Sequence, residues 1–393
     1  MHVFGKRSIT IGQVMRVCFD GDVFKWQRIG GISRIYLELL PRLTRLDHSL
    51  HITVAVQGPV RPETLKILAP WYKAIPYISA EWWPWQFWRV VRLFVNQWLW
   101  NTCWLSFRPD VFLSTYYTVS TVRVPRVCVV YDLGVELFGH FFPPEWVKAE
   151  LQRKENTIRN ADTFICISKS TLKDLLRIYG VDERRCRVIH LAGFSREVLD
   201  DVGMQNPVPE SRFLLYVGEY RSRYKNFKFM LQALAGTAKL DGCDLVVVSA
   251  LVPTSDEVRS FADISGGRHI RFENNCDDDR LKALYASCEV FIYPSLYEGF
   301  GIPVLEALAC GAPVVCSDTS SMPEVGGAVV CYFDPTSESS FRVALAGALT
   351  EGREPAKMEA RKRQAATFSW DRTAEEFLEV LRESGGSSVG EKC

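Results

Sequence analysis

The sequence feature that most constrains the fold is the stretch from 293 to 318, YPSLYEGFGIPVLEALACGAPVVCSD. The apolar run at 290–293 predicts a short buried strand, and the Pro-Ser pair and the glycines that follow interrupt it. A helix is predicted next, with Pro303 in its first turn and Gly311 just past its end. Val314 then begins another strand. This order of strand, glycine-rich loop, helix and strand is half of a nucleotide-binding parallel sheet.

The glycine-rich loop is the first candidate binding element. Glycines let the backbone approach a ligand closely, and the N–H groups that open a helix favour an anion such as a diphosphate. We therefore expect a nucleotide to contact this loop and the start of the helix, at Gly299, Phe300, Gly301 and Ile302.

Two carboxylates flank the loop. Glu298 precedes the glycines, and Glu306 lies eight positions later on the predicted helix. Because carboxylates accept hydrogen bonds from neighbouring hydroxyl groups, a sugar nucleotide would use both of them. We expect one glutamate to hold the sugar and the other to hold the ribose.

The same residues carry a resemblance to a known family. The segment E-GFGIPVL-E resembles the E-x7-E signature of retaining glycosyltransferases of family 4, and further motifs agree: WQRIGGISRIYLELL, ADTFICISKSTLKDL, YVGEYRSRYKNF, SSMPEV and FSW. The pattern is most similar to mannosyltransferase-like enzymes that build O-antigen and other bacterial surface polysaccharides. The resemblance implies the GT-B fold, an α/β architecture of two Rossmann-like domains that face each other across a cleft.

The length of 393 residues suits two domains. We expect residues 1–196 to form the acceptor-side domain, 197–211 a linker that contains Gly and Pro, and 212–369 the domain that binds the nucleotide sugar. As GT-B proteins do, the chain is expected to cross back onto the first domain with a helix at about 370–384. The tail 385–393 is expected to be disordered.

The first half offers two pairs of candidate donor-binding residues. Gly30 and Gly31 precede an apolar pattern at helical spacing, and they are either a substrate contact or a plain tight turn. Tyr131 and Asp132 end a strand, at the edge where open α/β sheets bind ligands. The family often has His-Asp at this place. We expect Tyr131 to replace the histidine as a hydrogen-bond donor, whereas Asp132 either contacts the ligand or only holds the turn.

A basic turn opens the second half. Gly218 ends a predicted strand, and Arg221, Arg223 and Lys225 follow it. Two fixed cations here would balance a diphosphate. The resemblance implies that Arg221 and Lys225 stabilise the departing diphosphate and act with Glu298 in catalysis, with Arg223 as a competitor for the first position. The alternative is a solvated basic turn.

The resemblance implies transfer of a hexose, with retention at the anomeric carbon, from a nucleoside diphosphate sugar to a glycan acceptor that is expected to be lipid-linked. GDP-mannose is the expected donor, by resemblance only. We expect neither a cofactor nor a metal, because the protein supplies the positive charge.

A nicotinamide dehydrogenase is disfavoured, since no G-x-G-x-x-G follows the first strand. A non-catalytic protein that binds sugar nucleotides or glycans would keep the same fold and stays open.

Composition and hydropathy bear on compartment and partners. The twelve cysteines are scattered without a CxxC pair or a Cys/His cluster, so neither a zinc site nor a disulfide framework is expected. The net charge of +1 gives no indication of nucleic acid. The first dozen residues lack an apolar signal segment, and the longest uncharged run, 93–107, is too short to span a bilayer. We expect a cytoplasmic protein.

One segment is unusual in composition. Residues 82–104 hold seven of the eleven tryptophans, with Arg89 and Arg92 among them. Tryptophan with arginine suits a membrane interface, which would place the protein peripherally on the inner face of the cell membrane. A core helix with large side chains, a subunit contact or an acceptor contact is the alternative.

Overall fold

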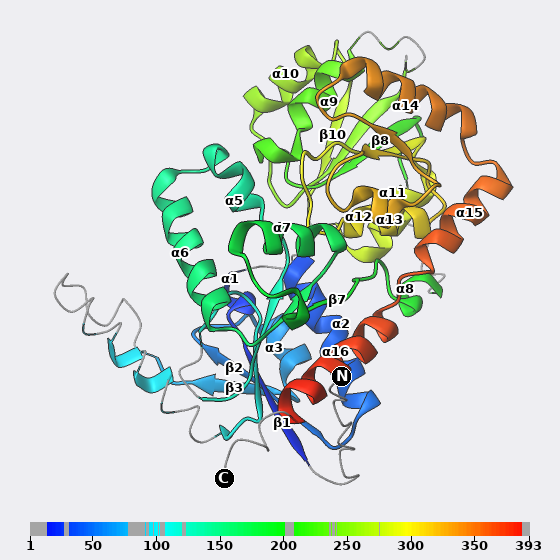
Figure 1. The fold of residues 1–393 in the computed structure, drawn as a ribbon. Coiled ribbons are helices and arrows are strands. Elements are labelled where there is room, and N and C mark those ends of the chain that lie inside the picture. The colour runs from blue at the N-terminus through cyan, green and yellow to red at the C-terminus, as the bar shows by residue number, and fades with distance from the viewer. Residues whose placement is uncertain are drawn as a thin grey trace.

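The computed structural model describes residues 14–26, 31–77, 91, 94–96, 98–100, 102, 107–119, 123–200, 208–235, 237, 240, 242–274 and 276–386. These residues form two lobes, each of which is a parallel sheet with helices packed on it (Figure 1).

The first lobe contains a sheet of seven strands in the order β3-β2-β1-β4-β5-β6-β7, and all neighbours are parallel. The strands are β1 (Met15–Asp20), β2 (Leu50–Gln57), β3 (Tyr72–Ile75), β4 (Val111–Ser114), β5 (Arg126–Val130), β6 (Thr163–Cys166) and β7 (Cys186–Val188). Strand β4 is buried along its whole length, as expected for a strand covered on both faces. The edge strand β3 was not predicted, because only Ile75 of its residues is fully buried.

The second lobe contains a six-stranded parallel sheet in the order β10-β9-β8-β11-β12-β13. The strands are β8 (Phe213–Val217), β9 (Asp244–Val248), β10 (Ile270–Glu273), β11 (Val290–Tyr293), β12 (Val314–Ser317) and β13 (Cys331–Phe333). The two Rossmann-like sheets confirm the predicted α/β fold class.

The described helices alternate with these strands. In the first lobe they are α1 (Val23–Trp26), α2 (Gly31–Leu46), α3 (Pro62–Leu68), α5 (Gly134–Phe138), α6 (Pro144–Asn160), α7 (Lys169–Tyr179) and α8 (Arg196–Asp200). In the second lobe they are α9 (Phe227–Leu234), α10 (Ser255–Ile264), α11 (Asp278–Ser287), α12 (Ile302–Ala309), α13 (Met322–Gly326), α14 (Glu338–Glu351) and α15 (Pro355–Ala365). Helix α8 occupies part of the predicted linker, and residues 201–207 of that linker lie outside the described residues.

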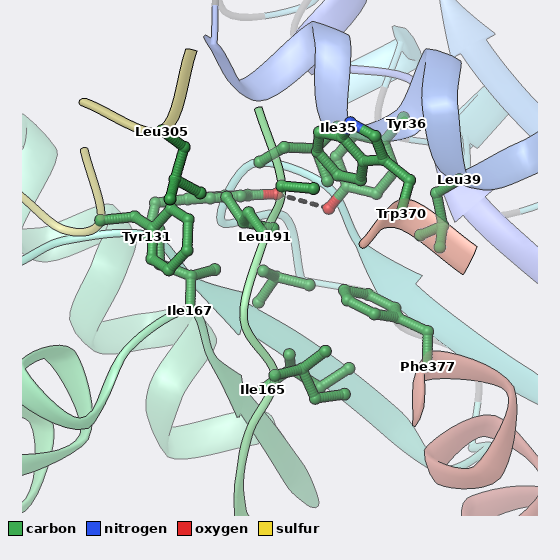
Figure 2. Close-up of a cluster of buried hydrophobic side chains, with 14 of the residues drawn as sticks. Ile35, Tyr36, Leu39, Tyr131, Ile165, Ile167, Leu191, Leu305, Trp370 and Phe377 are labelled. Atoms are coloured by element: carbon green, nitrogen blue, oxygen red, sulfur yellow. Dashed lines mark hydrogen bonds between the residues drawn. The ribbon is translucent and has the colours of Figure 1, made fainter. Parts of the chain in front are cut away.

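The last helix, α16 (Trp370–Gly386), returns to the first lobe. The indole N–H of Trp370 donates to the carbonyl of Gly193 at 2.8 Å. Figure 2 shows Trp370 and Phe377 of this helix in a common apolar cluster with Tyr36 of α2. The helix ends two residues later than predicted, because Gly385 is buried and packs closely on the first sheet. The predicted tail beyond Gly386 lies outside the described residues.

Two further expectations concern membranes. None of the described helices combines the length and the apolar character that crossing a lipid bilayer requires. Most of the tryptophan-rich segment 82–104 lies outside the described residues. Of its described tryptophans, Trp98 is exposed and Trp100 is buried.

Candidate active site

A cavity of about 1580 Å³ lies between the two lobes. Gly31 and Asp132 line it from the first lobe, and Lys225 and Glu298 line it from the second. The cavity therefore meets the loops that follow strands of both sheets, as expected for ligand sites of open α/β sheets.

The topology of the second sheet explains why two distant loops meet in this cavity. Strands β8 and β11 are neighbours, although β9 and β10 come between them in the chain. Ligands bind at such a switch point, because the loops that leave the two strands diverge and open a crevice. The loop after β8 carries Lys225, and the loop after β11 carries Glu298.

Lys225 and Glu298 form an ion pair at this switch point. The Nζ atom of Lys225 lies 2.6 Å from Oε1 of Glu298. Burial alone would lower the pKa of Lys225, but the carboxylate of Glu298 outweighs it and the pKa is raised above its ordinary value. The ammonium group therefore stays charged, as a cation must to stabilise a phosphate.

The loop that carries Glu298 is held by hydrogen bonds from its neighbours. The amide of Leu296 donates to the carbonyl of Tyr224 at 2.8 Å, which ties the loop to the basic turn. The amide of Glu298 donates to the hydroxyl of Ser320 at 3.0 Å, and the hydroxyl of Ser321 donates to the carbonyl of Phe300 at 2.7 Å. The positions of the charged groups are thus fixed before a ligand arrives.

The loop also reaches into the first lobe. The hydroxyl of Tyr297 donates to Asp174 at 3.1 Å, and Thr171 donates to the carbonyl of Gly299 at 3.2 Å. A Cβ atom on Gly299 would lie 1.8 Å from the carbonyl oxygen of Tyr131. Only glycine allows this approach of two backbones across the lobes.

We predict that Gly299→Ala destabilises the protein by about 1–3 kcal/mol or more, because a backbone oxygen of the other lobe must move away. Thermal unfolding should show the lower melting temperature. Gly386→Ala is the matched control, since its Cβ would have open space. An unchanged melting temperature for Gly299→Ala would contradict the tight contact.

The start of α12 also lines the cavity, through Gly301 and Ile302. Gly301 has a φ of 107°, and a Cβ there would lie 2.6 Å from Cε of Met322. The ring of Phe300 packs near His190 and Phe368, so a ligand would meet its backbone rather than its ring. A side chain at Gly301 would thus meet Met322 at once, so the backbone of this loop needs glycine there.

Glu306 lies behind the cavity wall and is only 3% exposed. Arg34 of α2, from the other lobe, places Nη1 3.0 Å from Oε1 of Glu306, and Tyr285 donates to Oε2 at 3.4 Å. Burial raises the pKa of Glu306 to about 7, and Arg34 opposes this shift. Arg34 also pairs with Asp278, which lines the cavity. A ligand would have to share or replace Arg34 to reach Glu306.

Tyr131 lines the cavity, but its hydroxyl group points into the first lobe. The hydroxyl donates to the carbonyl of Thr115 at 2.8 Å and contacts the hydroxyl of Tyr36 (Figure 2). The predicted role as a hydrogen-bond donor to the ligand is therefore not supported, because the protein interior already uses the hydroxyl proton. The carboxylate of Asp132 accepts from the amide of Gly134 at 2.9 Å and still faces the cavity.

Three glycine positions predicted from the sequence remain. Gly218 lines the cavity with a φ of 153°, and a Cβ there would lie 3.3 Å from the buried hydroxyl of Tyr216. Gly31 begins α2. Gly30 lies outside the described residues. Among the described residues, no group of three His, Cys, Asp or Glu side chains is placed to hold a metal ion.

Comparison with known proteins now assigns the chain. Residues 29–192 match the family described as Glycosyltransferase Family 4, and residues 203–365 match the family described as Glycosyl transferases group 1. The two matches together cover most of the chain and divide as the two lobes do. The chain belongs to the family 4 glycosyltransferases.

Curated relatives are named as glycosyltransferases, and a solved structure shares the fold. O-antigen chain mannosyltransferase B of Escherichia coli is 26% identical over 65% of this chain and 70% of its own length. Serotype-specific mannosyltransferase WbdA of Escherichia coli is 40% identical over 71% of this chain, which spans only 37% of WbdA. Sucrose-phosphate synthase from Thermosynechococcus elongatus superposes with a TM-score of 0.70 over 95% of this chain and 100% of its own, at 17% identity, which shows a shared GT-B fold.

The family 4 resemblance implied a diphosphate-binding role for Arg221, and the structure does not place Arg221 in the cavity. Its guanidinium pairs with Glu257 at 2.7 Å, and the side chain is 42% exposed. Glu257 is fixed because it forms a capping box with Thr254 at the start of α10. The competitor Arg223 does not line the cavity either, and lies over the ring of Phe141. Two cationic side chains are found among the described residues that line the cavity, those of Lys225 and Arg61.

We predict that Arg221→Ala changes both donor affinity and turnover by no more than about twofold, because an exposed ion pair contributes little and the side chain lies outside the cavity. Steady-state kinetics with the donor would measure both constants. A large loss of turnover would restore the role that the family resemblance implied.

Proposed function

We propose that this protein is a retaining glycosyltransferase that moves a hexose from a nucleoside diphosphate sugar to a glycan acceptor in surface polysaccharide synthesis. The Lys225–Glu298 pair, held at the switch point of the second sheet, is the observation that carries the proposal. The relatives named mannosyltransferases support mannose as the sugar and GDP-mannose as the donor.

The proposed reaction is a displacement on one face of the sugar. The bond between the anomeric carbon and the phosphate oxygen breaks, and a bond from that carbon to the acceptor oxygen forms on the same face. The proton of the acceptor hydroxyl passes to the departing diphosphate. Because the bond to the anomeric carbon breaks as the proton arrives, negative charge develops on the diphosphate in the transition state. Lys225 and the amides at the start of α12 stabilise this charge.

The two glutamates keep distinct parts in this proposal. Glu298 accepts hydrogen bonds from the hydroxyls of the transferred sugar while it holds Lys225 in place. Glu306 accepts hydrogen bonds from the ribose, with the ribose hydroxyls replacing part of the Arg34 contact. A carboxylate offers about four acceptor positions, so Glu306 can keep Tyr285 as a partner.

A thermal-shift screen with GDP, UDP, dTDP and their sugars, followed by assay of nucleoside diphosphate release with a glycan acceptor, tests the proposal. We expect one nucleotide class to raise the melting temperature and its sugar to be turned over. Binding without turnover would favour the alternative of a non-catalytic sugar-nucleotide-binding protein. The absence of binding by any nucleotide would refute both and leave a non-catalytic protein that binds glycans.

The tryptophan-rich segment supports a further part of the proposal, that the acceptor is lipid-linked and the enzyme works peripherally on the membrane. We predict that replacing Trp83, Trp85 and Trp88 by alanine weakens sedimentation with anionic liposomes, because the aromatic groups would lose their place in the lipid interface. Lipid association that is equal in the variant and the wild type would refute this.

A further inference from the structure

A second, smaller pocket of about 240 Å³ opens beside the main cavity. Both are lined by Asp132, Lys225 and Glu298. A group bound in the side pocket would therefore lie next to the ion pair where we have proposed that the sugar is transferred.

The side pocket is lined by aromatic rings. The rings of Phe142 and Trp146 lie with their centroids 5.1 Å apart, and Tyr224 of the second lobe lies 6.0 Å from Phe142. Trp146 is 45% exposed although it lines the pocket, so part of a large apolar face is available to a ligand. The neighbouring Pro143 has a fixed φ at the start of α6, which limits the movement of these rings.

One stripe of α6 supplies both apolar and polar groups to this pocket. Trp146, Glu150 and Lys154 are spaced four residues apart, so they lie on the same face of the helix. All three line the pocket. The ring of Tyr117 also lines the pocket, 5.2 Å from the Nζ atom of Lys154, and Tyr117 has a φ of 54°, a strained value for a residue with a large side chain. Such strain is typical of ligand sites.

The charges of the pocket disfavour an anion. Its described lining includes the carboxylates of Asp132, Glu150 and Glu298, of which Glu150 pairs with Arg153 at 2.5 Å. Its ammonium groups are already engaged: Lys154 pairs with the buried Glu136 at 3.0 Å, and Lys225, which pairs with Glu298 at 2.6 Å, serves the donor diphosphate in the proposed reaction. The carboxylates of the pocket and its ion pairs (Asp132, Glu136, Glu150 and Glu298) outnumber the cations (Arg153, Lys154 and Lys225), so a phosphate bound beside a donor would add charge of the sign already in excess.

An uncharged sugar ring fits these observations. The C–H face of a pyranose is apolar and packs on aromatic rings through dispersion and loss of exposed apolar surface. Its hydroxyls are donors for carboxylates. The small volume suits a terminal residue rather than a long chain.

We propose that the side pocket binds the neutral, unphosphorylated terminal sugar of the acceptor, stacked on Trp146 and Phe142, and that it discriminates against acceptors that end in a phosphorylated sugar. The identification of this ligand as the acceptor rests on the proposed function. Because Tyr224 of the second lobe closes the pocket, the acceptor subsite is complete only when the lobes face each other as they do here.

Saturation-transfer NMR titration of the full chain tests this inference, with the methyl α-glycosides of mannose, glucose and galactose and with methyl α-mannoside 6-phosphate as probes. We expect at least one neutral glycoside to bind, and the 6-phosphate to bind at least about tenfold more weakly than the mannoside. Trp146→Ala should weaken neutral binding by about tenfold. Tyr77→Ala is the matched control, because Tyr77 is also 45% exposed but does not line the pocket.

The following results would overturn the inference: no glycoside binding by the wild type, equal binding by the two alanine variants, or phosphate-bearing sugar bound as tightly as the neutral one. Melting temperatures confirm that both variants are folded. Glycoside binding without turnover of any nucleotide sugar would refute the proposed function and leave the sugar pocket standing. Turnover with a preference for phosphorylated acceptors would support the proposed function and refute the inference about the side pocket.

Discussion

Lys225→Ala should lower kcat by about 100-fold to 1000-fold, the loss expected when a fixed group that stabilises developing charge is removed. Affinity for the donor should fall much less, because the ammonium group interacts most strongly with the diphosphate as it departs. Nucleoside diphosphate release at saturating donor measures this.

The ion pair complicates a single substitution, since Lys225→Ala leaves Glu298 partly buried without its partner. The double variant Lys225→Ala/Glu298→Gln removes both charges and separates the effects. If the double variant stays far less active than Glu298→Gln alone while its melting temperature returns toward that of the wild type, the cation itself is needed. Full activity in either variant would remove Lys225 from the mechanism.

Glu306→Gln should weaken donor binding by at least about tenfold, because a charged acceptor for the ribose hydroxyls is lost from a buried site. Isothermal titration with the nucleotide that the thermal-shift screen selects would measure the change. Glu324→Gln is the matched control. Glu324 makes another polar contact between the lobes, 2.5 Å from Nε2 of His190, but does not line the cavity. Equal effects of the two substitutions would mean that loosening of the lobes, not the loss of a ribose contact, lowers the affinity.

The same carboxyl group should make donor affinity pH-dependent. Burial raises the pKa of Glu306 to about 7 in the unliganded protein, so the group takes up a proton as the pH falls below about 7. A protonated carboxyl is a poorer acceptor, and affinity should therefore rise with pH and level off above about 7. Glu306→Gln cannot titrate and should lack this dependence. A wild-type affinity that is flat between pH 5.5 and pH 8 would contradict the assignment.

Most strands of the two sheets could be predicted from the sequence, because buried parallel strands are short apolar runs between turn signals. Val290 to Tyr293 and Phe213 to Val217 are such runs, and both strands have the predicted bounds. Strand β3 carries no such signal, since it lies at the edge and is mostly exposed. Helix α10 was also missed, although the capping pair Thr254 and Glu257 is readable in the sequence.

The candidate site could be predicted where the loop after a strand of the second sheet carries a charged residue that lines the cavity, as for Lys225 and Glu298. Arg221 could not be placed, because its position depends on a carboxylate from another helix that competes with the ligand. Arg34 was not predicted as a site residue, because its partner Glu306 comes from the other lobe. Trp146 was not predicted either, because its neighbour Phe142 lies in a loop that carries no recognisable motif. The four-residue spacing of Trp146, Glu150 and Lys154 is the signal that would have found the side pocket.

The contacts between the Glu298 loop and the first lobe affect how chimeras of such enzymes can be designed. Tyr297 and Gly299 contact Asp174 and Thr171 in the first lobe, and they approach the backbone of Tyr131. A chimera made by exchanging whole halves with a relative at the linker would preserve both sheets and still misplace the loop. New donor specificity is therefore more readily grafted when the loop and its receiving surface are transplanted as one unit.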